Sequence, residues 1–118
     1  EIVMDVLVEI NSGAEESKGG ILLDEAEDFC LALRDFPHIR LRGFMTMAPK
    51  CENSAQYCEY FEETSRRVLD IWRKKLHNII EDPLLSMGMS DDFDIAVEEG
   101  ANLIRLGTAL FGRRIYNL

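Results

Sequence analysis

Four short apolar segments alternate with helical patterns along this chain of 118 residues. The segments are Val6–Ile10, Leu41–Met47, Leu84–Met87 and Leu103–Leu106. Strands that alternate with helices usually pair in parallel and are joined by right-handed crossovers. The sequence therefore predicts an α/β fold with the order β-α-β-α-β-α-β, followed by a short C-terminal turn of helix.

Three amphipathic patterns fill the gaps between these segments. In the first, we expect Asp24 to cap a helix, with Glu27 three residues later as its reciprocal partner. The second pattern predicts a long helix from about Ser54 to about Asn78. The third predicts a short helix from about Asp91 to Glu99, which ends at Gly100 as the left-handed residue.

The charge and cysteine content narrow the class of protein. The formal net charge of −9 disfavours nucleic acid and anionic membranes, which attract excess Lys and Arg. No apolar run approaches the roughly 20 residues needed to span a bilayer. Three cysteines with no CxxC pair suggest free thiols in a reducing compartment, and neither a disulfide framework nor a metal site. We expect one cytoplasmic domain over residues 1–118, whose native start lies upstream because Glu1 is not Met.

Two of the expected strand ends carry the parts of a phosphate cradle. In parallel α/β folds, ligands bind at the C-terminal ends of strands. Gly88 is followed by Ser90, and Gly107 by Thr108, and a helix begins after each pair. Glycine allows close backbone approach, and a helix N-terminus presents unpaired N–H groups to an anion. The alternative is ordinary turn and N-cap chemistry, and both interpretations stay open on these residues alone.

Three charged residues complicate this picture. Arg105 lies inside the fourth apolar segment, where strand alternation puts it with Leu103 on one face. A charge there needs an acceptor, which a ligand or a carboxylate such as Glu9 would supply. Asp91 and Asp92 would repel a phosphate, unless they cap the short helix and point away.

The same segments resemble a known family. Ser86 to Asp92 and Ile104 to Gly112 are similar to the C-terminal signature of the YggS family of pyridoxal 5′-phosphate homeostasis proteins. Glu16–Gly20 and Leu41–Thr46 agree with it. The resemblance implies a TIM (β/α)8 barrel of the alanine racemase N-terminal type. This chain would be the C-terminal half, strands five to eight, of that pyridoxal-phosphate-binding barrel.

The resemblance also implies a cofactor site. Ser90, Gly107 and Thr108 match the phosphate-contacting positions, and Arg105 matches an arginine close to the pyridine ring. The full set of implied cofactor-binding residues is Ser86, Gly88, Ser90, Arg105, Gly107 and Thr108. The family's Schiff-base lysine lies on the first strand, so none of Lys18, Lys50, Lys74 and Lys75 matches it. Only phosphate contacts are therefore expected from this chain.

The function that this resemblance favours is cofactor homeostasis by binding, without catalysis. One alternative is a fragment of a pyridoxal-phosphate enzyme of the alanine racemase type. That enzyme needs a Tyr acid/base, but Tyr57 and Tyr60 fall on the long helix and Tyr116 lies past the last strand. Another alternative is a non-catalytic half-barrel that serves assembly. Its open edges, at Val6–Ile10 and Leu103–Leu106, predict self-association or pairing with a missing N-terminal half.

Overall fold

The computed structural model describes residues 2–11, 19–49, 51–74 and 82–112. Among them lies a three-stranded sheet of order β1-β2-β3, made of β1 (Met4–Ile10), β2 (Ile39–Thr46) and β3 (Leu84–Met87). Both strand pairs are parallel, which confirms the prediction from the alternating pattern.

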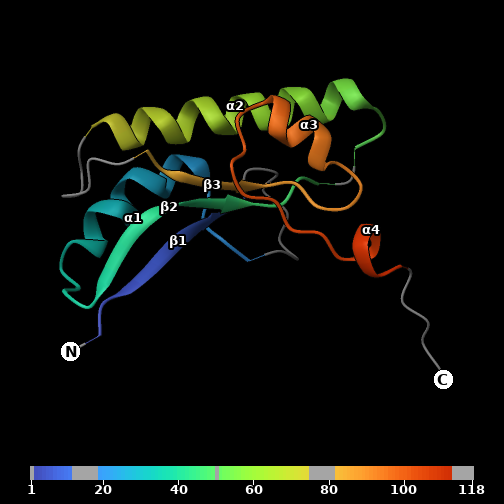
Figure 1. The fold of residues 1–118 in the computed structure, drawn as a ribbon. Coiled ribbons are helices and arrows are strands. Elements are labelled where there is room, and N and C mark those ends of the chain that lie inside the picture. Colours follow the sequence, from blue (N-terminus) through green and yellow to red (C-terminus); the bar gives the residue numbers. More distant parts are fainter. Residues whose placement is uncertain (1, 12–18, 50, 75–81, 113–118) are drawn as a thin grey trace.

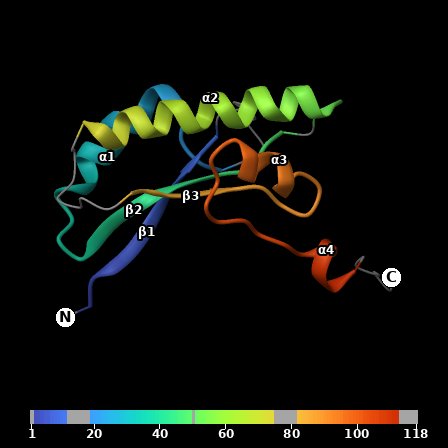
Figure 2. The same cartoon turned by 45° about the horizontal axis from the view of Figure 1, so that its top comes forward.

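The helices divide into two groups by position. The first group is α1 (Ala26–Leu33), with the 3-10 turn η1 (Leu23–Glu25) before it, α2 (Ser54–Arg73) and α3 (Phe93–Glu98). These cover one side of the sheet, whereas α4 (Thr108–Phe111) lies beyond the C-terminal ends of the strands (Figures 1 and 2). None of the described helices is both long and apolar enough to cross a membrane.

One face of the sheet packs against the helices. Val8, Phe44 and Leu85 are paired in register across the three strands, and all three are buried. The ring of Phe44 meets that of Trp72 on α2 edge to face, with centroids 6.2 Å apart. Burial of each such side chain stabilises the fold by about 1.5–3 kcal/mol. The buried apolar core is Val8, Ile10, Ala26, Cys30, Leu41, Phe44, Phe61, Val68, Trp72, Leu85, Met87, Ala96 and Ala101.

The long helix α2 begins at an asparagine cap. The Asn53 side chain accepts the backbone N–H of Gln56 at 3.0 Å, and Gln56 Oε1 accepts the N–H of Glu52 at 2.8 Å. The first bond satisfies an N–H group that the helix start leaves unpaired, and the second fixes the residue before the cap. The helix is described to Arg73, and the predicted continuation over 75–78 lies outside the described residues.

The predicted cap of the first helix is wrong. Asp24 lies within η1, and no side chain caps either η1 or α1. Its carboxylate instead accepts a hydrogen bond from Arg67 of α2 at 2.5 Å, and Glu27 pairs with Lys74 at 2.8 Å. Asp24 therefore joins η1 to α2, and Glu27 joins α1 to the end of α2. Both ion pairs link residues far apart in sequence, so the local sequence does not predict them. The predicted end of the short third helix is confirmed, because Gly100 follows it in a left-handed conformation with φ of +114°.

The predicted strand over Leu103–Leu106 is also wrong, since only Leu103 forms a bridge, to Ser86. The Asn102 side chain takes the N–H of Leu85 at 2.6 Å, where a neighbouring strand would place a backbone carbonyl. Gly88, with φ of +100°, then ends the extended backbone of β3. Beyond Leu103, the N–H of Arg105 bonds to the carbonyl of Gly88 at 3.0 Å, so this segment follows the turn after β3 and does not extend the ladder.

The free edge of β1 is shorter than predicted. Ile21 donates its N–H to the carbonyl of Glu9 at 3.0 Å and accepts the N–H of Asn11 at 2.7 Å. The C-terminal end of this edge is thus already paired. Beside the remainder runs a groove of about 280 Å3, which we call the β1 groove. Its lining residues are Val6, Leu7, Val8, Glu9, Gly20, Ile21, Phe29, Leu33 and Ile39.

Candidate functional site

A cavity of about 490 Å3 opens beyond the C-terminal ends of the strands, between the loop after β3 and α4. Ser90, Gly107 and Thr108, three of the residues expected to bind cofactor, line it together. The other lining residues are Met89, Asp91, Phe111 and Gly112. Two loops that lie 17 residues apart in sequence thus form one wall, as the strand-end argument requires.

Ser90 marks the point where backbone donors converge. Its Oγ accepts the N–H of Gly107 at 3.1 Å and the N–H of Ala109 at 2.9 Å. These amides belong to the first turn of α4 and the residue before it, so their dipoles favour a partly negative group. The two donors are therefore aimed at an oxygen in the wall of the cavity, the geometry that a phosphate oxygen also requires.

The two glycines of the expected phosphate site, Gly88 and Gly107, have different structural roles. A Cβ added to Gly107 would meet nothing within 4 Å, so this backbone faces open space in the cavity wall. A Cβ on Gly88 would lie 2.8 Å from the Cβ of Ala96 and 3.0 Å from the Cα of Phe93. Gly88 does not line the cavity, and its missing side chain is explained by the close packing of α3.

The other two expected residues lie on the sheet face opposite the helices. Ser86 is in register with Met45 of β2 and Glu9 of β1, and is 2% exposed. Arg105 reaches the same face, where its Nη2 lies 3.5 Å from the sulfur of Met45. No ion pair joins Arg105 to Glu9, and its buried Nε has no hydrogen-bond partner. A buried donor without an acceptor is rare in folded proteins, which sets this atom apart from its neighbours.

The two acids beside the cavity point in different directions. Asp91 is exposed and lines the cavity, whereas Asp92 is buried and accepts the N–H of Met89 at 2.7 Å. Asp92 thus points away from the cavity as expected, but the expectation that these acids cap the short helix is wrong, because no side chain caps α3. Burial and then the charge of Asp92 raise the pKa of the Cys51 thiol.

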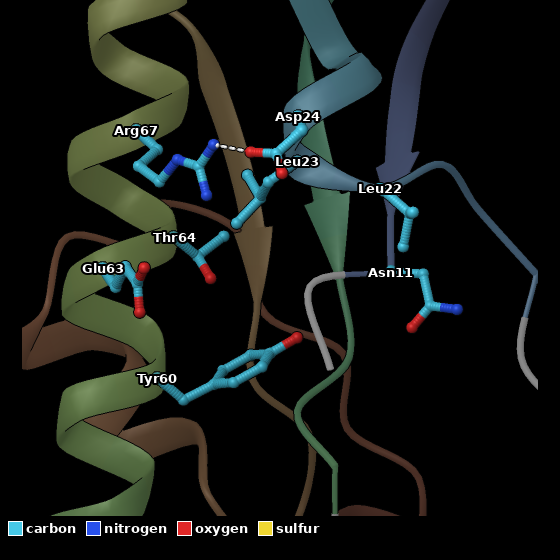
Figure 3. A pocket seen from close by; sticks show the side chains of 8 residues that line it. All are labelled: Asn11, Leu22, Leu23, Asp24, Tyr60, Glu63, Thr64 and Arg67. Atoms are coloured by element: carbon cyan, nitrogen blue, oxygen red, sulfur yellow. Dashed lines mark hydrogen bonds and ion pairs between the residues drawn. The ribbon is translucent and has the colours of Figure 1, made fainter. Parts of the chain in front are cut away.

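A second cavity, of about 230 Å3, lies between α2 and the chain before α1. Figure 3 shows Arg67 reaching Asp24 across it, so its guanidinium is already paired. None of the residues expected to bind cofactor lines it. The lining residues are Asn11, Leu22, Leu23, Asp24, Tyr60, Glu63, Thr64 and Arg67.

Both tyrosines of α2 are engaged in structural contacts. The Tyr60 hydroxyl lies 3.0 Å from Thr46 Oγ1 and donates to the carbonyl of Met47 at 3.3 Å. The Tyr57 hydroxyl accepts the N–H of Cys51 at 3.2 Å. Tyr116 lies outside the described residues. Neither described tyrosine lines the cavity beside α4.

Sequence reasoning missed the apolar wall of this cavity. Met89 and Phe111 line it, and their exposed fractions are 41% and 81%. The only signal in the sequence was their position, directly beside the glycines and hydroxyls already chosen. Together they give the cavity one polar wall and one apolar wall, a combination typical of sites for small molecules.

Comparison with known proteins points to one family. A family model described as the N-terminal domain of alanine racemase matches residues 2–114. The chain is 40% identical over 115 residues to the pyridoxal phosphate homeostasis protein of Aquifex aeolicus, covering 98% of this chain and 49% of that protein. The protein of the same name from Escherichia coli K12 is 36% identical, with 97% of this chain and 47% of that protein covered. The chain therefore spans about half the length of these curated relatives.

Solved structures agree with this result. PipY of Synechococcus elongatus, solved without PLP, superposes with a TM-score of 0.81 and 26% identity over 93% of this chain and 50% of PipY. PipY with PLP bound gives 0.76 at 25% identity, over 94% of this chain and 50% of PipY. Alanine racemase of Corynebacterium glutamicum, at 0.71 and 21% identity, covers 94% of this chain and 30% of the racemase, and shares the fold alone.

Proposed function

The chain belongs to the alanine racemase N-terminal domain family, and on that premise we propose that it binds the phosphate of pyridoxal 5′-phosphate and serves the homeostasis of that cofactor. The observation that carries the proposal is the meeting of Ser90, Gly107 and Thr108 on one cavity. The relatives named for cofactor homeostasis and the PLP-bound neighbour support the choice of ligand.

The residues present suit a phosphate. Gly107 leaves open space where any other residue would put a Cβ, so an anion can approach the backbone closely. The hydroxyl of Ser90 already lies at the point where two amides converge, and Thr108 supplies a second hydroxyl at the start of α4. Among the described residues of this wall, Asp91 carries the charge that would repel a phosphate, and its exposure to water weakens this repulsion.

Arg105 is proposed to contact the ring side of the cofactor. Its buried Nε has no acceptor. Its side chain lies beside Met45 on the sheet face opposite the helices, and Arg105 is not among the residues that line the phosphate cavity. A ring nitrogen would satisfy such a donor. Ser86, in register with Met45 on this face, would form the floor beneath the ring, while Gly88 would serve by shaping the turn.

We also propose that the chain supplies the C-terminal half of the family's barrel, with β1, β2 and β3 as strands five to seven and the single bridge at Leu103 in the place of strand eight. The β1 groove exposes apolar side chains, among them Phe29 at 42% and Ile39 at 37%. Apolar surface beside a free strand edge favours association with another strand–helix unit. Its partner is either the N-terminal half of a barrel or a second copy of this chain.

Binding without turnover is the proposed activity, in the cytoplasm. The alanine racemase alternative requires a tyrosine acid/base at the cofactor. Tyr57 and Tyr60 both lie on α2 and bond to the backbone around Met47 and Cys51 instead. Lys74, the one lysine among the described residues, pairs with Glu27 on the helix side of the sheet.

Two substitutions test the phosphate site. Gly107→Val puts a branched side chain into the open space and is expected to abolish binding of inorganic phosphate and pyridoxal phosphate. Thr108→Ala is expected to weaken both by about 1–2 kcal/mol, the scale of one hydrogen bond to a charged group. Calorimetric titration measures both effects, with pyridoxal as the ligand that lacks phosphate.

The control for Thr108→Ala is Ser54→Ala, which removes a hydroxyl from the first turn of α2, away from the cavity lining. This variant should bind inorganic phosphate and pyridoxal phosphate with the affinity of the wild type. If Gly107→Val and Thr108→Ala also titrate like the wild type, the phosphate site lies elsewhere.

A further inference from the structure

The turn that carries Ser90 is held by one buried carboxylate. Asp92 is 8% exposed, and its Oδ1 accepts the N–H of Met89 at 2.7 Å. The backbone closes the same turn, because the N–H groups of Asp92 and Phe93 donate to the carbonyl of Met89 at 3.2 and 2.9 Å. This is the arrangement in which an acid three residues into a helical turn reaches back to the first N–H.

The electrostatic surroundings of this carboxylate also bear on its role. Among the residues that the structure describes, no ion pair involves Asp92, although a buried charge is costly without a partner. The hydrogen bond from the N–H of Met89 is the contact that stabilises this carboxylate. A buried acid that accepts a backbone N–H of its own turn points to a local role for that bond, and Ser90 lies inside the turn that the bond closes.

Ser90 in turn connects this turn to α4. Its Oγ accepts the N–H groups of Gly107 and Ala109, so the hydroxyl must stay within about 3 Å of both. A shift of the turn by 1 Å would break both contacts. Gly88, with its φ of +100°, fixes the turn at the other end.

We propose that Asp92 is a positioning residue that holds the Ser90 hydroxyl against the amides of Gly107 and Ala109. The proposal deepens the proposed phosphate site and rests on it for its biological meaning, but the geometric claim stands on the hydrogen bonds alone. Asp92 touches no ligand in this account. It acts through Met89 and Ser90.

Amide hydrogen exchange of the 118-residue chain, measured residue by residue by NMR, tests the geometric claim without any ligand. In Asp92→Ala, the amides of Gly107 and Ala109 should exchange about tenfold faster, the factor that corresponds to one lost hydrogen bond. Asp92→Asn retains an oxygen that can accept from Met89, and its exchange should stay within about twofold of the wild type.

A double-mutant cycle with Ser90→Ala separates positioning from general loosening. If Asp92 acts through Ser90, adding Asp92→Ala to Ser90→Ala should change exchange at Gly107 by less than about twofold. If Asp92→Ala accelerates exchange at Gly107 as much in the Ser90→Ala background as in the wild type, the proposal is overturned. So would a folded Asp92→Asn protein with fast exchange at these amides, an outcome that decides the matter even if Asp92→Ala fails to fold.

Titration with inorganic phosphate links the claim to function. Asp92→Ala should weaken phosphate binding by about as much as Ser90→Ala does, and the double variant should be no weaker. If the wild-type chain binds no phosphate, the proposed function fails, whereas the exchange cycle still decides the role of Asp92. If Asp92→Ala binds phosphate as the wild type does, positioning has no effect on the site and the inference fails.

Discussion

Alanine substitution at Gly88 and Gly107 should separate a glycine needed for folding from a glycine needed for a ligand. Gly88 has φ of +100°, which costs a residue with a Cβ about 1–3 kcal/mol. Its new Cβ would also lie 2.8 Å from that of Ala96, and overpacking of this kind costs about 1–3 kcal/mol. The sum, about 2–6 kcal/mol, is a large part of the roughly 5–15 kcal/mol by which a domain is stable.

Gly107 should behave in the opposite way. Its φ is −116°, and an added Cβ meets nothing within 4 Å, so Gly107→Ala should change the free energy of unfolding by no more than about 1 kcal/mol. Urea denaturation followed by circular dichroism measures both variants. The reasoning is refuted if Gly88→Ala lies within about 0.5 kcal/mol of the wild type, or if Gly107→Ala is destabilised as strongly as Gly88→Ala.

Three further predictions concern a surface ion pair, covalent binding and association. A hydrogen bond from Arg40 lowers the pKa of Asp5 from its ordinary value, so the stabilisation by this pair is present above the ordinary pKa and is lost as the pH falls through the lowered folded-state pKa. The urea midpoints of the wild type and Asp5→Asn should therefore differ at pH 7 and converge in acid, and a pH-independent difference would contradict this. When pyridoxal phosphate is added and reduced with borohydride, no single lysine should be labelled stoichiometrically, because none matches the Schiff-base position. Detection by mass spectrometry of one uniquely labelled peptide would contradict this. Light scattering at micromolar concentration should detect association through the β1 groove, whereas a compact monomer that unfolds cooperatively would argue against it.

The parallel order of the strands was predictable because periodicity alone separates short apolar segments from amphipathic ones. From that order, the meeting of Ser90 with Gly107 and Thr108 also followed, since the C-terminal ends of parallel strands lie at one edge of a sheet. No ligand contact tests these residues, so their role stays a prediction.

Other features depended on contacts between distant parts of the chain. Asp24 has the sequence context of a cap, but Arg67, 43 residues away, takes its carboxylate. The fourth apolar segment has the composition of a strand, but Gly88 ends the extended backbone of β3, and the N–H of Arg105 bonds to the Gly88 carbonyl instead of continuing the ladder. Gly88 looks like Gly107 in sequence, and only the position of α3 shows that one serves packing and the other leaves open space.

The central claim, a phosphate site between the loop after β3 and the start of α4, is tested most directly by NMR titration of the 118-residue chain. Inorganic phosphate and pyridoxal phosphate should produce saturable shifts that are largest at the backbone amides of Ser90, Gly107, Thr108 and Ala109, whereas pyridoxal should not shift these amides. Saturable shifts centred instead on the cavity beside Arg67, or no saturable shifts with either phosphate ligand, would contradict the claim.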